Sequence, residues 1–363
     1  MLILRICIFA KTELMKKFVL PLLLVIIYTG VNAQDKVVKG LQETNDKKGF
    51  RNDTTHKEGW KKGGVFTLNV GQGSSSNWAA GAEKFSLSVA GNISVFADYR
   101  RGKFKWDNSL DLGYAMVNTT STGLRKTDDR LDFYSKMGHS LSEKLSISGV
   151  VNFRTQFSKG FDYNYLGKGY QRKTSDFMSP GYLVLAPGLD WHPVPYFNVF
   201  FSPISSRFVF VINDPNSYYF PNGVIPIADG GGFELPLAAL YGVDPARKVR
   251  AELGAFVSAN FAKEIFKNIS YKSRLDLYSN YLKSYRYTAT GPSELNIEKQ
   301  DVKPQNVDIY WTNLIVMKIN KFLNVTYNFD LIYDDDVRQF GPQKTSAATQ
   351  IRSLLAVGVS LTF

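Results

Sequence analysis

Apolar and polar residues alternate along much of this chain, and its final stretch shows the pattern clearly. Between positions 355 and 363 every second residue is large and apolar, whereas the residues between them are mostly small or polar. A period of two is typical of a β-strand with one apolar face. The apolar positions of this strand are Leu355, Val357, Val359, Leu361 and Phe363.

The same alternation recurs in eleven earlier segments. Between 85 and 99 it holds for fifteen residues, longer than the mean soluble strand of about 5–6 residues. An even number of strands is typical of single-chain bacterial barrels. The twelve predicted strands lie at about 64–72, 85–99, 104–116, 129–141, 145–157, 177–191, 198–212, 249–262, 269–282, 307–319, 323–333 and 353–363.

Short and long connections alternate between these strands. Outer-membrane barrels have short periplasmic turns and longer outer loops, so the alternation predicts that both termini are periplasmic. The short connections lie near 101–102, 142–144, 193–196, 264–268 and 320–321. The long ones cover about 73–83, 118–128, 158–176, 213–248, 284–305 and 334–352.

The first residues predict export. A basic start at 15–17 precedes a short apolar run at 18–28, and Val31 and Ala33 provide the small side chains that a signal peptidase reads, so we expect cleavage before Gln34. The apolar run is too short for a spanning helix, which needs about 20 residues.

These features divide the chain into three parts. We expect a signal peptide at 1–33 that begins at Met15, a periplasmic tail at 34–62 and the barrel at 63–363. The signal segment carries four of the 44 basic residues and one of the 32 acidic ones, so the mature charge is 40 − 31 = +9. Export excludes nucleic acid as the partner of this charge, which fits outer-membrane lipids and lipopolysaccharide.

Two stretches resemble a known family. "GWKKGGVFTLNVGQGSSSNWAAGAEKFSLS" (59–88) and "RRGKFKWDNSLDLGYAMV" (100–117) are similar to a Bacteroidota outer-membrane family catalogued only as a domain of unknown function. The resemblance implies an integral barrel in the outer membrane and carries no activity. The last strand is also similar to the signal that the bacterial barrel-assembly machinery reads. The expected fold is therefore all-β: one up-and-down transmembrane antiparallel barrel of about 12 strands.

The inward positions of the predicted strands carry charges of both signs. Charges in a barrel lumen must be paired or hydrated. We favour a hydrated plug of ion-paired side chains, and a narrow channel for small solutes remains the alternative. The inward charges are Asp107, Asp111, Asp132, Lys136, Arg154, Arg250, Glu252, Arg274, Asp276, Asp308 and Asp330.

No arrangement of residues indicates catalysis. His139 and Ser140 are neighbours on a predicted strand, so their side chains point to opposite faces and cannot form a nucleophile–base pair. His192 borders a turn, and the single cysteine, Cys7, lies in the signal segment. We therefore expect no metal, no cofactor and a structural or accessory role in the envelope, with a membrane-embedded hydrolase as a further alternative.

Three other segments suggest roles for the loops. Asp334 to Asp336 predict a solvated acidic loop rather than a calcium site, and Gly71 and Gly73 predict a flared rim on the first hairpin. The loop at 213–248 is rich in apolar residues, so the barrel mouth, the lipid rim or a protein partner must bury it.

Overall fold

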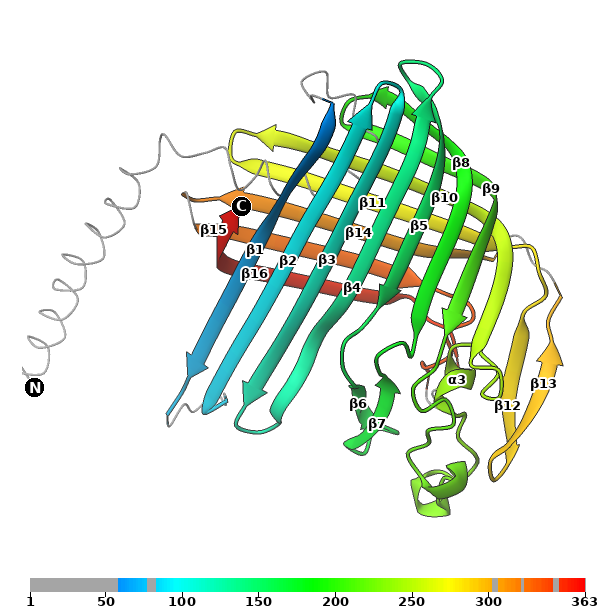
Figure 1. The fold of residues 1–363 in the computed structure, drawn as a ribbon. Helices are drawn as coiled ribbons and strands as arrows, with labels where there is room; N and C mark the ends of the chain where they lie inside the picture. The colour runs from blue at the N-terminus through cyan, green and yellow to red at the C-terminus, as the bar shows by residue number, and fades with distance from the viewer. Residues whose placement is uncertain (1–57, 77–82, 302–305, 321–322, 342–345, 363) are drawn as a thin grey trace, which may run out of the picture.

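The twelve predicted strands all form, and they close into one antiparallel barrel. The computed structural model describes residues 58–76, 83–301, 306–320, 323–341 and 346–362. Around the barrel the order is β1-β16-β15-β14-β11-β10-β9-β8-β5-β4-β3-β2 (Figure 1). The strands are β1 (Gly59–Ser74), β2 (Phe85–Arg101), β3 (Phe104–Thr119), β4 (Gly123–Ser140), β5 (Leu145–Thr155), β8 (Gly181–Val194), β9 (Phe197–Phe210), β10 (Val249–Phe266), β11 (Ile269–Asn280), β14 (Val307–Lys318), β15 (Leu323–Tyr333) and β16 (Gln350–Thr362).

The barrel is polar inside and apolar outside. On β11 the inward residues Lys272, Arg274 and Asp276 are buried, and the outward residues Leu275 and Leu277 are partly exposed. This arrangement inverts that of a soluble protein, which rarely exposes large contiguous apolar patches. Exposed outward residues lie all around the barrel: Leu68, Ile93, Phe133, Ile147, Leu185, Phe201, Leu253, Trp311 and Leu355.

β1 and β16 close the barrel as the sequence predicts, but over a short distance. They pair from Val65↔Thr362 to Asn69↔Gly358, which is five residue pairs. On its other side β1 pairs with β2 over its whole length, from Gly59 to Ser74. The ring is therefore closed near the middle of β1, and the two strands do not pair beyond Asn69 and Gly358 in the described residues.

The connections contain further elements that the sequence pattern did not predict. Two hairpins, β6 (Gly160–Tyr165) with β7 (Tyr170–Ser175) and β12 (Tyr285–Gly291) with β13 (Glu294–Lys299), project from one end of the barrel (Figure 1). The connection between β9 and β10 forms the short helices η2 (Pro221–Gly223), η3 (Ile227–Asp229) and α3 (Leu237–Leu240).

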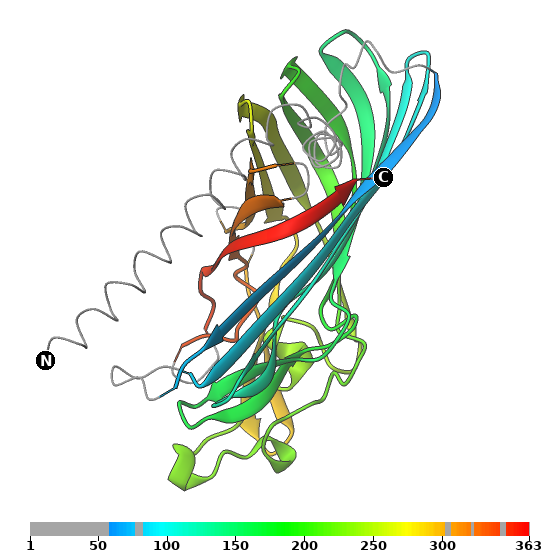
Figure 2. The ribbon, with the colours of Figure 1, turned by 90° about the vertical axis from the view of Figure 1, so that its left-hand side faces the viewer.

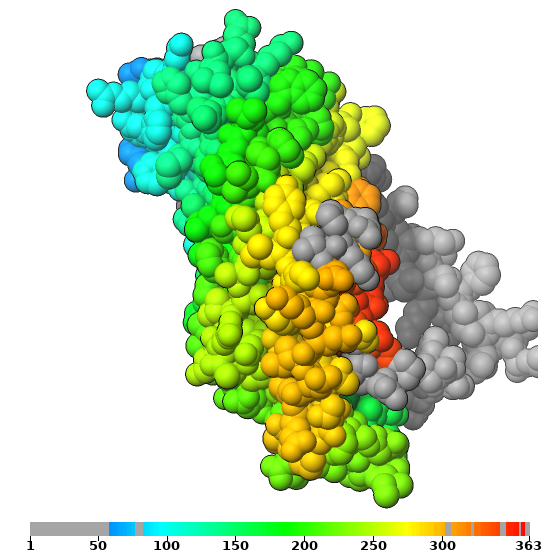
Figure 3. Space-filling model, turned by 90° about the vertical axis from the view of Figure 1, so that its right-hand side faces the viewer, coloured from blue at the N-terminus to red at the C-terminus, as the bar shows by residue number. Residues whose placement is uncertain are grey.

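Helix α3 anchors a small hydrophobic core outside the barrel. Its four residues are buried with Val209 and Val211 at the end of β9 and with Tyr287 of β12. The space-filling view shows β13 and β12, in orange and yellow, beside this connection (Figure 3). The mouth of the barrel thus buries much of the apolar 213–248 loop. No helix in the described part of the chain is long and apolar enough to cross a membrane.

Three predicted boundaries differ from the structure. The connection at 118–128 was expected to be long, but β3 and β4 pair up to Thr119↔Gly123 and only a tight turn joins them. A register shift opposite Ala115 and Met116 leaves one extra residue, Thr127, on β4, and it interrupts the alternation of β4 before residue 128. β1 begins at Gly59 and β16 at Gln350, each earlier than expected.

Candidate functional site: the lumen and its mouth

The predicted lumen charges lie inside the barrel, where they form separate clusters of ion pairs. The first cluster lies toward the short turns. Lys136 on β4 contacts Asp190 on β8, and both side chains are 0% exposed. His192 Nε2 lies 3.2 Å from the same carboxylate, and Asn198 donates a 3.0 Å hydrogen bond to it. This end of the lumen is therefore filled by a buried, hydrogen-bonded ion pair.

The second cluster lies on β4, β5, β10 and β11. Arg274 contacts Asp276 at 2.6 Å and Asp132 at 3.5 Å. Asn152 donates a 2.6 Å hydrogen bond to Asp132, and Ser258 donates one of 2.7 Å to Asp276. Each carboxylate thus accepts a hydrogen bond from an uncharged donor besides its contact with the arginine, as buried charges require.

The third cluster lies at the mouth of the barrel and includes loop residues. Arg207 contacts Glu252 at 2.6 Å and Asp308 at 2.7 Å. Arg250 contacts Glu252 at 2.7 Å and Asp336 at 2.9 Å. Three strands, β9, β10 and β14, and the β15–β16 connection therefore meet at two guanidinium groups.

A fourth cluster joins strands that are not neighbours. Arg352 on β16 contacts Asp330 on the adjacent β15 and also Asp128 on β4. Three strands, β1, β2 and β3, separate β16 from β4 in the ring. Arg352 therefore links β16 to β4 through the interior of the barrel. Of the other predicted lumen charges, Asp107 contacts Arg100, Asp111 accepts a hydrogen bond from Ser94, and Arg154 stacks on the Tyr310 ring.

Apolar side chains fill one half of the lumen between these clusters. They project inward from β4, β5, β8, β9, β10 and β11 and are buried by one another. The group comprises Tyr134, Val150, Val184, Ala186, Phe200, Phe256 and Tyr278. A packed apolar cluster of this kind leaves little room for water on that side.

Two cavities also lie in the lumen, and Val184, Phe256 and Tyr278 of the apolar cluster line the larger one. The larger, here called the mouth cavity, has a volume of about 720 Å³ and is lined by Arg154, Tyr182, Tyr310 and Arg352 among others. The inner cavity has a volume of about 130 Å³ and includes Asn69 in its lining. Arg130, Tyr310 and Asp330 line both cavities and so form the boundary between them.

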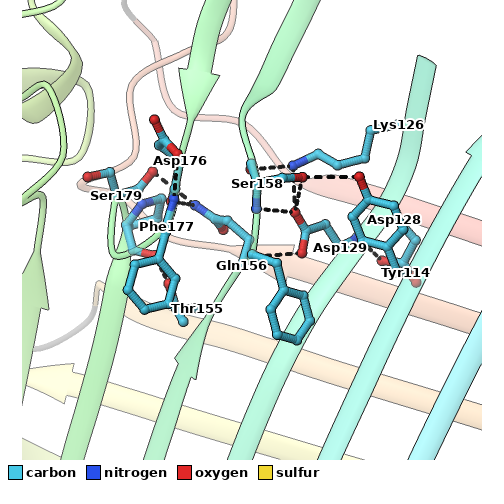
Figure 4. A network of polar contacts seen from close by, with 12 residues as sticks. Tyr114, Lys126, Asp128, Asp129, Thr155, Gln156, Ser158, Asp176, Phe177 and Ser179 are labelled. Atoms are coloured by element: carbon cyan, nitrogen blue, oxygen red, sulfur yellow. Dashed lines mark hydrogen bonds and ion pairs between the residues drawn. The ribbon is translucent and has the colours of Figure 1, made fainter. Parts of the chain in front are cut away.

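A network of hydrogen bonds holds one wall of the mouth in place (Figure 4). Asp129 accepts hydrogen bonds from the Phe157 and Ser158 amides at 2.7 and 2.9 Å and from Lys126 at 2.8 Å. Gln156 donates to the carbonyl oxygens of Asp176 and Ser179. The chain that leaves β5 is therefore tied to β4 before it forms the β6–β7 hairpin.

The β6–β7 hairpin and residues 213–248 pack together and are here called the cap. Glu234, which is buried, accepts hydrogen bonds from the Tyr219 and Phe220 amides at 3.0 and 2.8 Å. Arg172 of β7 lies 3.9 Å from Glu234 and donates a 2.6 Å hydrogen bond to the Leu235 carbonyl. These contacts fix the loop to the hairpin.

Polar contacts at the edge of the cap shift the pKa values of their groups. Hydrogen bonds from Lys168 and Tyr170 lower the pKa of the Asp229 carboxyl. The hydrogen bond from Lys173 to Asp214, 2.6 Å long, likewise lowers the pKa of the Asp214 carboxyl. Burial raises the pKa of Tyr241 to about 12.

Several sequence-based assignments need correction. His192 does not border a turn, because it lies within β8, buried beside Asp190. Asp334 and Asp336 are not solvated: Asp336 contacts Arg250, and Asp334 lies 3.8 Å from Arg207. Burial and neighbouring carboxylates raise the pKa of Asp336.

Other assignments concern the surface and the ends of the strands. His139 is exposed near the end of β4, and Gly71 and Gly73 belong to β1 rather than to a loop. On β16 the side chains of Leu355, Val357 and Val359 are exposed. The side chains of Leu361 and Phe363 lie outside the described residues, as do the signal segment and most of the tail.

The sequence pattern missed three residues that organise the lumen. Arg207 escaped because β9 has a register shift between Ser202 and Ser205, which reverses its alternation. Asp190 has the same parity as the inward residues Val184 and Ala186, a signal that could have identified it. Arg352 fell outside the expected last strand.

In the described ranges of the chain, no group of three or more His, Cys, Asp or Glu side chains could hold a metal ion. The neighbours His139 and Ser140 occupy adjacent positions on one strand, where side chains alternate between faces.

Comparison with known proteins adds a family description and several similar folds. Residues 70–161 match a family described as a protein of unknown function (DUF3078). No curated protein matches the chain. Among solved structures, the translocator domain of the autotransporter NalP from Neisseria meningitidis is 7% identical with a TM-score of 0.35, covering 85% of this chain and 90% of that one.

Two further structures are similar at the same level. An outer membrane channel from Pseudomonas putida F1 is 9% identical with a TM-score of 0.35, covering 86% of this chain and 99% of that one. The outer membrane phospholipase A from Escherichia coli is 7% identical with a TM-score of 0.30, covering 90% and 98%. The closed order of the strands, rather than these likenesses, defines the fold.

Proposed function

We propose that this chain is an integral outer-membrane barrel with a structural or accessory role in the cell envelope and a lumen closed to steady ion flow. The apolar outer surface is the observation that carries the membrane assignment, because its exposed residues recur around the whole ring. Strands crossing lipid must pair all their backbone groups, which a closed barrel achieves.

The packing of the lumen supports closure. Three buried ion-pair clusters and the apolar cluster around Tyr134 and Phe200 occupy the lumen. Charges of both signs neutralise one another, so they give a pore no selective lining. Arg130, Tyr310 and Asp330 separate the two cavities of the lumen.

The orientation and the partners follow from the same proposal. The long connections and both extra hairpins lie at one end of the barrel, which we assign to the cell exterior (Figure 1). The termini are then periplasmic, and the signal segment is removed before Gln34. The outer-membrane lipids, lipopolysaccharide and the barrel-assembly machinery are its partners during insertion. The exposed tip of the 213–248 loop, where Ile227 is 94% exposed, offers a surface to a protein partner.

Fractionation and bilayer recording test this function. The full-length protein is expected in the outer-membrane fraction, with a gel mobility that changes on boiling. Reconstituted into planar bilayers, it is expected to carry no steady current. Recovery of folded protein in the soluble periplasmic fraction would refute the membrane assignment.

A narrow channel is the second candidate, because the two cavities share a boundary. Replacement of Arg130 by Ala removes the longest side chain at that boundary. A sealed barrel stays silent in both forms, whereas a channel conducts and its current rises in the R130A variant.

A further inference from the structure

The seam between β1 and β16 opens toward the mouth of the barrel. If the register of the five pairs continued, Val70 would face Val357 and Ser74 would face Ser353. Instead, among the residues that the structure describes, Val70–Ser74 of β1 pair only with β2, and Gln350–Val357 of β16 pair only with β15. Figure 2 shows the two strands, in blue and red, meeting near the end of β16 and separating below it. These unpaired edges are here called the wedge.

Packing at the last pair explains where the strands begin to separate. The Asn69 side chain occupies the position that a Cβ on Gly358 would need. Asn69 is buried and lines the inner cavity, whereas all five β1 residues beyond it are exposed. The change from buried to exposed at one residue marks the apex of the wedge.

The outer rim of the wedge is apolar. On β1, Val70 is 58% exposed, and on β16, Leu355 is 66% and Val357 is 54% exposed. These side chains continue the apolar outer surface of the barrel. In the proposed membrane location the wedge therefore opens into the hydrocarbon region of the bilayer. Unpaired backbone groups there need water or a ligand as a partner.

The inner side of the wedge is charged. Arg352 points into the lumen, lines the mouth cavity and contacts Asp128 on β4. Because β1, β2 and β3 lie between the two strands in the ring, this ion pair spans the interior behind the wedge. A molecule that passes through the wedge thus meets apolar side chains first and a guanidinium group next.

The mouth cavity has the size and composition of a binding site for an amphiphile. Its volume of about 720 Å³ falls in the range of about 300–1,000 Å³ typical of ligand pockets. Phe161, Ile309 and Phe340 contribute apolar walls. Arg154, which also lines the cavity, stacks on the Tyr310 ring with its guanidinium carbon 4.3 Å from the ring centroid, and it forms no ion pair with a described residue.

We infer that the wedge is a lateral opening through which an amphiphile with an apolar chain and an anionic head group moves between the outer leaflet and the mouth cavity. The head group binds Arg154 and replaces Asp128 as the partner of Arg352. The inference rests on the proposed membrane location. A carboxylate or a phosphate head group satisfies the same arginines, because both accept paired hydrogen bonds from guanidinium groups.

Closing the wedge tests the route. The V70C/V357C pair joins the two edges just beyond the last natural pair, either as a disulfide or through a bis-maleimide. The L68C/V359C pair, one step earlier in the existing ladder, is the matched control. A fluorescent C18 fatty acid supplied in lipid vesicles is expected to bind the control and the unmodified protein. Cross-linked V70C/V357C is expected to bind it at least tenfold more slowly.

Two side-chain variants test the recognition. R154Q and R352Q are each expected to weaken fatty-acid binding at least tenfold and to leave binding of the corresponding fatty alcohol unchanged. R125Q is the control, since Arg125 stacks on Tyr163 and does not line either cavity. Competing lipids then distinguish the two ligand classes. If phosphatidylglycerol vesicles displace the fluorescent fatty acid and oleate does not, the ligand is a phospholipid. If oleate displaces it and phosphatidylglycerol does not, the ligand is a free fatty acid.

Several outcomes would overturn the inference. They are equal binding rates in the two cross-linked pairs, equal loss of acid and alcohol binding in R154Q, or no binding of either probe by a heat-modifiable barrel. Disulfides between Val70→Cys residues of two molecules would assign the edge to a dimer instead. Absence of the protein from the outer membrane would instead refute the proposed function. The binding readouts thus distinguish failure of the lateral opening from failure of the proposed function.

Discussion

The buried pair of Lys136 and Asp190 allows a quantitative prediction for the closed lumen. Both side chains are fully buried, and Asp190 also contacts His192 and Asn198. At an effective dielectric constant of about 20, two charges about 3 Å apart attract each other by roughly 5–6 kcal/mol. Burial costs several kcal/mol for each ion, so the pair as a whole contributes little net stability.

Removing one partner has a much larger effect than removing both. The K136M variant leaves the Asp190 carboxylate buried without its cation, so we expect the free energy of unfolding to fall by about 3–5 kcal/mol. Adding D190N removes the stranded charge, and at least about 2 kcal/mol of the loss is expected to return. K144M, in the exposed β4–β5 turn, is the matched control and is expected to change stability by less than about 0.5 kcal/mol.

Urea titration of the reconstituted protein, followed by the gel shift of the folded form, measures these differences. An unfolding midpoint for K136M equal to that of the unmodified protein would contradict the assignment of a buried pair. A double variant no more stable than K136M would show that the two side chains are not coupled.

Three further predictions concern the membrane face and the cap. L112R places a charge on the outer face of β3, whereas D111N changes its inward neighbour. In the same urea assay we expect L112R to lower the free energy of unfolding by about 2–4 kcal/mol more than D111N does. Equal effects of the two variants would show that the register of β3 is wrong. E234Q weakens the hydrogen bonds that Glu234 accepts from the Tyr219 and Phe220 amides. We therefore expect a protease to cleave the E234Q variant faster within 213–248, while the gel shift of the barrel stays unchanged. An unchanged cleavage rate would contradict the role of Glu234 in holding this loop. The lowered pKa of Asp214 means that the folded cap binds its proton more weakly, so the Lys173 contact stabilises the cap above pH of about 4 and is lost on further acidification. Below that pH, pepsin is therefore expected to cleave the cap faster in the unmodified protein, measured relative to a D214N control. An unchanged cleavage rate would contradict a stabilising role of the Lys173–Asp214 contact.

The strands and their faces were predictable because alternation is a local property. Leu355, Val357 and Val359 could be assigned to the outer face from their spacing alone, and their side chains are exposed in the structure. The pattern lost accuracy where register shifts occur, as at Arg207 on β9 and near Thr127 on β4. One extra residue there exchanges the inner and outer faces without any change in composition.

The pairing of the lumen charges could not be predicted in the same way. Arg352 and Asp128 are far apart in the sequence, and three strands separate them in the ring. Their contact depends on the stagger between neighbouring strands and on where β1 departs from β16. The period of a strand contains no information about either quantity.

The sequence by itself determined the number of strands, their inner and outer faces and the presence of opposite charges in the lumen, because each follows from residue spacing along single strands. The tertiary structure decided which charges pair, how the 213–248 loop is buried and where the seam opens. These features arise from side chains that meet only after the barrel closes, so their geometry depends on register and curvature rather than on local pattern.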